Sequence, residues 1–264
     1  MSERSRNDQS ALPRERISAA IAQAGPRGPA LVAFMTAGYP SREHFIDDLR
    51  AVASVADVVE IGVPFTDPMA DGVTIQRSSE QALRAGVSLR WIIAQLRAAQ
   101  DLTTPLLLMS YLNPLLAYGT DALARDARVA GVCGLIVPDL PFDESAPLRA
   151  ALGREGLALV QMVTPVTPPE RLAQVAGASE GFVYAVTMTG TTGHAVSEAR
   201  DIRAYLQRVR AVARVPVCAG FGIRSREQVD ALRGQVDGVI VGSALVEVLE
   251  RGESPQAWLA ALRG

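Results

Sequence analysis

The stretch VVEIGVPFTDPMADG, residues 58–72, begins as a short apolar run and ends as a loop rich in glycine and proline. A continuous apolar run of this length is typical of a parallel strand that is buried on both faces. Glu60 interrupts the run, and two more carboxylates, Asp67 and Asp71, follow in the loop. The stretch therefore indicates a buried strand with candidate functional carboxylates at its C-terminal end.

Seven further apolar runs have the same character, and segments long enough for helices separate them. We expect strands at residues 31–36, 58–62, 105–110, 134–138, 157–162, 181–187, 215–219 and 238–242. Eight alternating strand–helix units in about 230 residues predict an α/β fold, a single-domain (β/α)8 TIM barrel. A doubly wound open sheet is the alternative, but the chain has no dinucleotide-binding glycine fingerprint. The C-terminal ends of barrel strands face the active site, so Glu60 is an active-site candidate on position alone.

Several of the intervening segments carry helix start and stop signals. Helices are expected from Ser41, which follows Pro40, after Ser225, and over residues 143–153, which end in glycine. Residues 17–24 are expected to form a short extra helix that closes the bottom of the barrel. The first dozen residues are polar, so we expect one domain over residues 1–264 with about residues 1–13 disordered.

The composition excludes several classes of chemistry. The chain has 264 residues, a net charge of −2 and no lysine, so all 26 cationic residues are arginine. A lysine Schiff base is therefore ruled out, with substrate or with pyridoxal phosphate. The near-neutral charge offers no electrostatic footprint for nucleic acid. Two histidines (His44, His194) and two cysteines (Cys133, Cys218) provide no metal-ligand spacing.

The chain is expected to be cytoplasmic. Cys133 and Cys218 lie in apolar surroundings far apart in the sequence, as expected of free thiols in a reducing compartment. The first ten residues, MSERSRNDQS, lack the apolar core of a signal peptide. No run approaches the ~20 apolar residues of a membrane helix. We expect a soluble protein without a membrane or nucleic-acid partner.

Three glycine-bearing junctions follow the last three strands: GTTG at residues 190–193, GFG at 220–222 and GSA at 242–244. Glycine lets the backbone approach a ligand closely, and the helix that is expected to start at Ser243 directs N–H groups and its dipole toward an anion. One such glycine can simply form a tight turn. Three junctions on one rim instead predict a phosphate-bearing substrate, as is common in these barrels.

The thirteen residues 60–72 closely resemble the signature of the tryptophan synthase alpha subunit family. The resemblance extends from about Leu31 to the C-terminus and includes FMTAGYP at 34–40, MSYLNP at 109–114 and VPDLP at 137–141. It implies a (β/α)8 barrel and the retro-aldol cleavage of indole-3-glycerol phosphate to indole and glyceraldehyde 3-phosphate. This is a lyase reaction of tryptophan biosynthesis.

The resemblance also implies the roles of individual residues. Glu60 matches the catalytic glutamate, which protonates indole C3 and then accepts the side-chain hydroxyl proton, and burial would raise its pKa as this requires. Asp71 matches the catalytic aspartate, which stays ionised and stabilises the charge developing at the ring N–H. Phe34 matches a position beside the indole ring. The positions around the phosphate are Tyr184, Thr192, Gly193, Gly222, Gly242 and Ser243.

A partner is implied as well, namely the tryptophan synthase beta subunit in an alpha2beta2 complex. Asp67 matches an aspartate that relays signals between the subunits, with Pro64 and Phe65 in an apolar contact surface beside it. Pyridoxal phosphate is expected in the beta subunit and no cofactor in this chain. One departure is the loop TMTGTTGH, residues 187–194, which lacks the arginine of many members. This loop is expected to act as a lid, and His194 either contributes to its contacts or is exposed to solvent.

Alternative interpretations remain open at this point. A free-standing indole-3-glycerol phosphate lyase would keep the carboxylates and the phosphate site but lose the interface. An inactive homologue that activates a beta subunit, and another phosphate-binding barrel enzyme, are less favoured by residues 60–72. Individual aspartates also have structural alternatives: Asp67 and Asp71 suit turns before Pro68 and Gly72, and Asp139 suits a turn or a helix cap.

Overall fold

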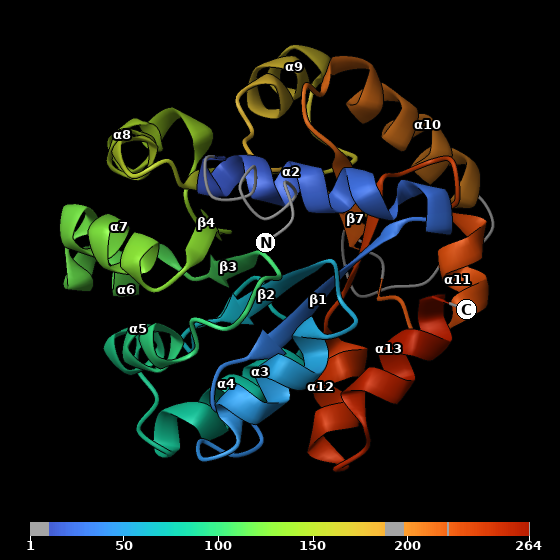
Figure 1. Cartoon of the computed structure of the whole chain (residues 1–264). Coiled ribbons are helices and arrows are strands. Elements are labelled where there is room, and N and C mark those ends of the chain that lie inside the picture. The colour runs from blue at the N-terminus through green and yellow to red at the C-terminus, as the bar shows by residue number, and fades with distance from the viewer. Residues whose placement is uncertain (1–10, 188–197, 221, 264) are drawn as a thin grey trace.

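Eight parallel strands close into a barrel in which each pairs with the next and the last pairs with the first (Figure 1). The computed structural model describes residues 11–187, 198–220 and 222–263. The predicted TIM barrel is confirmed, and the open-sheet alternative is wrong. The strands are β1 (Ala30–Thr36), β2 (Val58–Gly62), β3 (Leu106–Met109), β4 (Val132–Ile136), β5 (Ala158–Val163), β6 (Val183–Val186), β7 (Val217–Gly220) and β8 (Gly238–Val241).

Helices lie between the strands and form the outer layer of the barrel (Figure 1). In α3, for example, Phe45, Leu49 and Val52 lie on one face and are buried against the strands. The helices of this layer are α3 (Phe45–Ala53), α4 (Val73–Arg84), α5 (Leu89–Ala98), α6 (Leu112–Tyr118), α7 (Thr120–Val129), α8 (Ala146–Arg154), α9 (Pro169–Gly177), α10 (Glu198–Val212), α11 (Arg226–Ala231), α12 (Ser243–Glu250) and α13 (Pro255–Arg263). Two short 3-10 turns are η1 (Gly25–Arg27) and η2 (Phe142–Glu144).

Register inside the barrel determines where Glu60 lies. Val32 of β1 pairs with Val58 of β2, and both belong to the apolar cluster that fills the barrel. Phe34 pairs with Glu60 two residues further along the same strands. Because side chains alternate across a strand, Phe34 and Glu60 also face inward, one layer closer to the C-terminal ends. The apolar run thus carries Glu60 into the mouth of the barrel.

Helix α2 (Pro13–Ala24) lies across the end of the barrel where the strands begin (Figure 1). Its residues Ile17 and Ile21 are buried in the cluster that fills the barrel, and the Ser18 hydroxyl donates to the Gly181 carbonyl just before β6, at 2.6 Å. The predicted closing helix is confirmed, but it begins at Pro13 rather than at Ile17. Proline suits the first turn of a helix because the N–H groups of that turn have no acceptor within the helix, so the N–H that proline lacks is not needed.

We expect Ile17→Ala to lower the free energy of unfolding by about 2–5 kcal/mol, because it opens a cavity between α2 and the barrel interior. Ile17 is fully buried, whereas Gln23 on the same helix is exposed. Gln23→Ala is therefore the matched control and should change stability by no more than about 0.5 kcal/mol. Urea unfolding followed by circular dichroism measures both. Equal effects of the two substitutions would show that α2 does not stabilise the barrel.

Most strand ends differ from the prediction by one or two residues, and three differences have an identifiable feature beside them. β4 lies two residues earlier than the expected 134–138, and its pairing with β3 shifts between Leu106 and Leu107. The helix expected from residue 143 begins at Ala146, after the turn η2, because Pro147 must lie in the first turn. The helix expected from Ser41 begins at Phe45, while the Ser41 hydroxyl donates to Glu43 at 2.8 Å instead of capping a helix.

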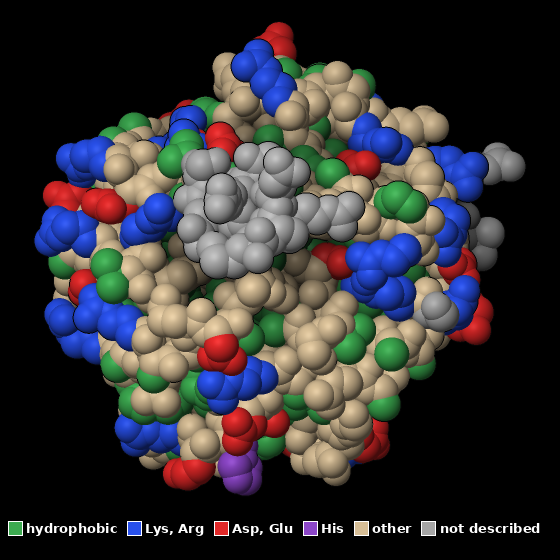
Figure 2. All heavy atoms as spheres, viewed as in Figure 1, with side chains coloured by type: hydrophobic (Ala, Val, Ile, Leu, Met, Phe, Trp, Pro, Cys, Tyr) green, Lys and Arg blue, Asp and Glu red, His purple; other side chains and the backbone are tan. Residues whose placement is uncertain are grey.

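Charged side chains of both signs are interspersed around the face of the barrel that α2 covers (Figure 2). Many of them form ion pairs on the surface, such as Arg154–Asp121 and Arg50–Asp101. Within the described ranges, no helix has the length and apolar character needed to cross a membrane.

Candidate active site

A cavity of about 360 Å³ opens at the C-terminal ends of the strands and contains most of the predicted site residues. Its wall includes Phe34, Glu60, Asp71, Tyr184, Gly222, Gly242 and Ser243. These residues come from β1, β2, β6 and the loops after β2, β7 and β8, so the closed barrel brings together positions far apart in the sequence. The predicted phosphate contacts Thr192 and Gly193, with His194, lie outside the described residues.

Glu60 is an isolated buried carboxyl group. Its side chain is 0% exposed, and neither carboxyl oxygen has a hydrogen-bond partner among the described residues. Burial without a compensating partner raises its pKa from 4.5 to about 8. Glu60 is therefore protonated at neutral pH and can donate a proton. No arginine pairs with it within the described ranges, which removes the ordinary structural explanation for a carboxylate in a barrel interior.

Asp71 is held at the edge of the same cavity by a residue that the sequence analysis missed. The Tyr111 hydroxyl donates to Asp71 Oδ2 at 3.0 Å and accepts from the Ala70 N–H at 2.9 Å. Burial raises the pKa of Asp71, and the hydrogen bond from Tyr111 opposes that shift. Tyr111 follows β3, whose C-terminal end borders the cavity, and this position is the signal that could have revealed it.

Two glycines make room for the aromatic side chains of the cavity. A Cβ atom at Gly62 would lie 2.5 Å from Phe34 Cζ, and one at Gly220 would lie 2.9 Å from the Tyr184 hydroxyl oxygen. Tyr184 lies near both carboxyl groups, since burial first and then the charges of Glu60 and Asp71 raise its pKa. Gly62 and Gly220 therefore leave the space that the Phe34 and Tyr184 rings occupy.

The predicted phosphate end of the cavity is built from backbone. Gly242 is the N-cap of α12 and Ser243 its first residue, and the first N–H groups of a helix have no acceptor within it. Gly222 has a φ of +62°, a conformation that glycine adopts without strain. No arginine is among the described residues of the cavity wall. An anion here would be held by N–H groups and the helix dipole.

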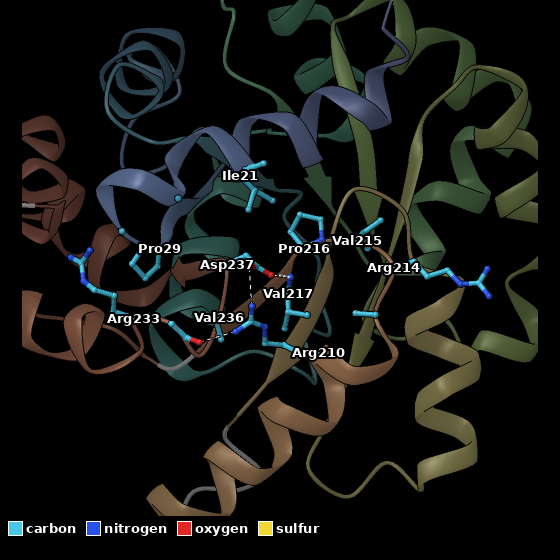
Figure 3. A pocket seen from close by; sticks show the side chains of 15 residues that line it. Ile21, Pro29, Arg210, Arg214, Val215, Pro216, Val217, Arg233, Val236 and Asp237 are labelled. Carbon is cyan, nitrogen blue, oxygen red and sulfur yellow. Dashed lines mark hydrogen bonds and ion pairs between the residues drawn. The ribbon is translucent and has the colours of Figure 1, made fainter.

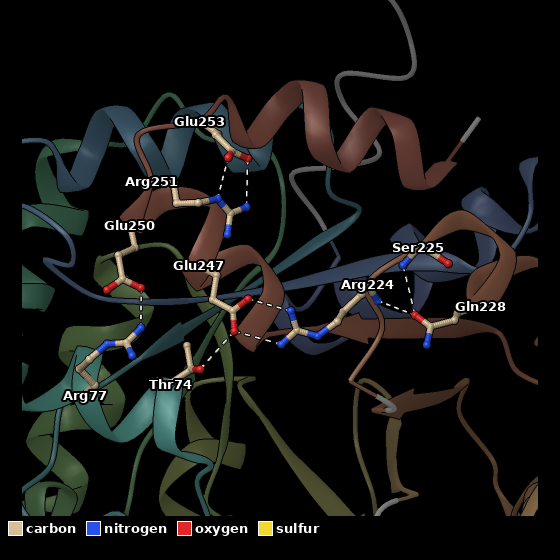
Figure 4. Close-up of polar contacts among 9 residues, drawn as sticks. All are labelled: Thr74, Arg77, Arg224, Ser225, Gln228, Glu247, Glu250, Arg251 and Glu253. Carbon is tan, nitrogen blue, oxygen red and sulfur yellow. Dashed lines mark hydrogen bonds and ion pairs between the residues drawn. The ribbon is translucent and has the colours of Figure 1, made fainter. Parts of the chain in front are cut away.

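A polar network braces this end (Figure 4). The Arg224 guanidinium, two residues after Gly222, donates to both carboxylate oxygens of Glu247 on α12, at 2.7 and 3.0 Å. The Thr74 hydroxyl at the start of α4 donates to the same carboxylate at 3.2 Å. Arg224 lowers the pKa of Glu247, which keeps the pair charged. The network joins the loop after β7 to α12 and α4, and none of its members was predicted.

The predicted partner-facing loop is only partly at the surface. Asp67 is exposed, and the Thr66 hydroxyl donates to it at 2.5 Å. Phe65 is half-buried and its ring stacks on Tyr111, whereas Pro64 is buried and offers no surface. The exposed apolar residue of the loop is instead Met69, which is 88% exposed. Asp139 accepts the Leu112 N–H at the start of α6 at 2.9 Å, in keeping with its interpretation as a cap.

A second cavity, of about 540 Å³, lies at the opposite end of the barrel (Figure 3). It contains Asp237, which accepts the Val217 N–H at 2.8 Å and lies 3.7 Å from Arg210. Figure 3 shows the Arg214 guanidinium directed away from it. The cavity lacks both candidate catalytic carboxylates and lies at the end of the barrel where catalytic sites are not found. Within the described ranges, no group of three or more His, Cys, Asp or Glu residues is arranged to hold a metal ion.

Comparison with known proteins agrees with this geometry. Residues 21–262 match the family model described as tryptophan synthase alpha chain. The tryptophan synthase alpha chain of Solidesulfovibrio magneticus is 44% identical over 237 residues, which cover 89% of this chain and 93% of that protein. The alpha chain of Carboxydothermus hydrogenoformans is 42% identical, with 89% of each chain covered.

Solved structures give the same result. A crystal structure of tryptophan synthase from M. tuberculosis in its aminoacrylate-bound form superposes with a TM-score of 0.84 at 37% identity, covering 94% of this chain and 98% of that one. The tryptophan synthase alpha subunit of Legionella pneumophila superposes with a TM-score of 0.83 at 31% identity, covering 94% and 97%. With the family model and curated relatives matching most of its length, the chain belongs to the tryptophan synthase alpha chain family.

Proposed function

We propose that this chain cleaves indole-3-glycerol phosphate into indole and glyceraldehyde 3-phosphate, with Glu60 and Asp71 as its catalytic residues. The reaction breaks a carbon–carbon bond in a retro-aldol step of tryptophan biosynthesis. The observation that carries the proposal is the Glu60 carboxyl group, which is buried, without a partner in the described structure, and protonated at neutral pH because burial raises its pKa to about 8. It is a proton donor aimed into a cavity that also has an anion-binding end.

Glu60 acts first as an acid and then as a base. The protonated carboxyl group places its proton on indole C3, which gives an indolenine with positive charge on the ring nitrogen. The resulting carboxylate then accepts the proton of the side-chain hydroxyl as the bond to C3 breaks. Both steps need a group whose pKa lies near the working pH, because it must give one proton to C3 and then take up another from the hydroxyl.

Asp71 stabilises the charge that develops on the ring nitrogen. Its carboxylate accepts the ring N–H, and the interaction strengthens as the nitrogen becomes positive. A fixed opposite charge in a partly desolvated site contributes more than it would in water. The two carboxyl groups thus take opposite protonation states, Glu60 neutral and Asp71 ionised. Burial raises the pKa of both, but a hydrogen bond from Tyr111 opposes the shift at Asp71, whereas Glu60 has no partner among the described residues. No cofactor takes part, and pyridoxal phosphate belongs to the beta subunit.

The substrate phosphate is held at the far end of the cavity by the backbone of Gly222, Gly242 and Ser243, together with Thr192 and Gly193 in the loop after β6. Among the described residues, Gly242 and Ser243 form the N-terminus of α12, and Gly222 adopts a left-handed backbone conformation on the same cavity wall. The N–H groups at a helix N-terminus favour an anion. Phe34 packs beside the indole ring, and Tyr184 borders the middle of the cavity.

Activity is expected to fall as the pH rises through about 8. Burial raises the pKa of Glu60 to about 8, and the reaction begins with its protonated form. Below that pH the proton donor is present, and above it the donor is lost by a factor of about 10 for each pH unit. Initial rates of indole release between pH 6 and 10 measure this limb. A rate that stays constant to pH 10 would contradict the assigned role of Glu60.

The chain is proposed to work with a beta subunit, as two alpha and two beta subunits, through Phe65, Asp67 and the exposed apolar residue Met69. We expect the purified chain to release indole slowly, and adding a matching beta subunit to raise the rate strongly. Fast release that the beta subunit does not change would instead identify a stand-alone lyase. No indole release under either condition would contradict the proposed function itself.

The cytoplasm is the compartment that we propose for this reaction. Cys133 and Cys218 are buried free thiols on different strands, and this state is typical of a reducing compartment.

A further inference from the structure

The Tyr111 hydroxyl makes two hydrogen bonds whose direction is fixed by chemistry. The Ala70 N–H can only donate, so the hydroxyl oxygen accepts from it at 2.9 Å. The single hydroxyl hydrogen is then free to point at Asp71 Oδ2, 3.0 Å away. Asp71 thus receives a hydrogen bond on one oxygen while the other remains for the substrate.

Tyr111 lies two residues after the end of β3, at the N-cap of α6, and its position is fixed by contacts to the barrel. Its side chain is buried, and the Ser110 hydroxyl donates to the Tyr111 carbonyl at 2.9 Å. The Ser110 N–H donates to the Ile136 carbonyl at 3.0 Å, which joins the segment after β3 to the end of β4. Asp71, in contrast, belongs to a loop whose preceding residues are exposed. The loop is therefore fastened to the scaffold at the position of its carboxylate.

We propose that Tyr111 is a positioning residue for the cleavage reaction, which keeps Asp71 ionised and directs its free oxygen toward the ring nitrogen of the substrate. This inference rests on the proposed function, which gives Asp71 its role. A hydrogen bond to a carboxylate favours the ionised form. Burial acts in the opposite direction on Asp71, so the hydroxyl offsets part of the cost of placing the charge in the cavity.

The other titratable groups near Asp71 leave Tyr111 as its hydrogen-bonding partner among the described side chains. Glu60 of β2 is neutral below about pH 8, and burial raises the pKa of Tyr184 on β6, so its phenol is neutral as well. Burial first, and then the charge of Asp71, raise the pKa of the Tyr111 phenol, and Asp139 after β4 adds a smaller contribution in the same direction. Loss of the Tyr111 hydroxyl would leave the Asp71 carboxylate without that offset.

Tyr111→Phe removes only the hydroxyl group. The ring, which stacks on Phe65 with centroids 5.0 Å apart, is kept, so the loop retains its apolar support. Without the hydrogen bond the pKa of Asp71 rises. As the pH is lowered, the Asp71 anion and the activity that needs it are therefore lost at a higher pH than in the wild type. We expect the acidic limb of the kcat/KM profile to move up by about one pH unit and the alkaline limb of Glu60 to stay in place.

The matched control is Tyr118→Phe. The Tyr118 hydroxyl also donates to an aspartate, Asp126 Oδ2 at 2.6 Å, but on the outer layer away from the cavity. Its pH profile should equal that of the wild type. A Tyr111→Phe enzyme that is active with an unshifted acidic limb would overturn the inference and leave the proposed function intact, whereas a wild type that releases no indole would refute the function.

Binding gives a second test that does not depend on turnover. In a Glu60→Gln background, the Kd of indole-3-glycerol phosphate is measured by calorimetry from pH 5 to 8, with and without Tyr111→Phe. We expect the double variant to lose affinity at a pH about one unit higher than the single variant. Weakening by the same factor at every pH would instead mean that Tyr111 only shapes the loop, and would contradict the proposed role.

Discussion

Glu60→Gln is expected to lower kcat for indole release by about 10²–10⁴-fold while the substrate still binds. Glutamine keeps the shape of the protonated side chain, but its amide does not transfer a proton to indole C3. The Kd for indole-3-glycerol phosphate should therefore stay within about threefold of the wild type, since the cavity wall is unchanged. Initial rates and calorimetry measure the two quantities. A variant that turns over at the wild-type rate would remove Glu60 from the mechanism.

Glu60→Gln lowers activity, but it is expected to raise the free energy of unfolding relative to the wild type at higher pH. This difference provides an internal control for the protonation of Glu60. The pKa of Glu60 is about 8 in the folded chain and ordinarily 4.5, so the folded state holds the proton more tightly than the unfolded state does. The stability that this carboxyl group contributes is fully present below pH 4.5 and is lost as the pH rises to about 8. Glu60→Gln does not titrate, so its stability relative to the wild type should increase across that range. A constant difference would mean that the carboxyl group is not held protonated.

Asp71→Asn is expected to reduce kcat by about 10²–10³-fold, because it removes a fixed negative charge from beside the developing positive charge. Asparagine keeps the size of the side chain and can still accept the ring N–H, so KM should change less than kcat. The acidic limb of the pH profile should also disappear, since the group that titrates there is gone. Steady-state rates as a function of pH test both expectations.

A suitable control for this charge removal is Asp121→Asn. Asp121 pairs with Arg154 on the surface, and both side chains are more than half exposed. Its removal should leave kcat, KM and the pH profile unchanged. If Asp71→Asn lowered the rate no more than Asp121→Asn does, Asp71 would be a turn residue before Gly72, as its sequence context also allows.

The strands of this barrel could be predicted because a strand that is buried on both faces consists of a continuous run of apolar residues. Predicted runs such as 58–62 coincide with the observed strand, and the two-residue error at β4 arises where its pairing with β3 shifts. Helix starts were harder to predict. The helix begins at Ala146 because Pro147 is tolerated only in the first turn of a helix. The predicted start at residue 143 did not take this rule into account.

The candidate site divides in the same way. Glu60 could be inferred from a charged residue in an apolar run, and Gly222 and Gly242 from their place after strands. Tyr111 was missed because its partner Asp71 is 40 residues away and the contact exists only where the loops after β2 and β3 meet. The brace between Arg224 and Glu247 joins separate loops and helices for the same reason. Contacts between neighbouring loops do not produce a characteristic residue spacing in the sequence, so no sequence pattern reveals them.

Cleavage of indole-3-glycerol phosphate by this chain can be tested by measuring both products of one reaction mixture. The chain and a beta subunit are incubated with indole-3-glycerol phosphate in the absence of serine, and indole and glyceraldehyde 3-phosphate are quantified against substrate consumed. We expect one molecule of each product for every molecule of substrate, with neither product formed at an appreciable rate by Glu60→Gln. Unequal amounts of the two products, or substrate left intact by the wild type, would contradict it.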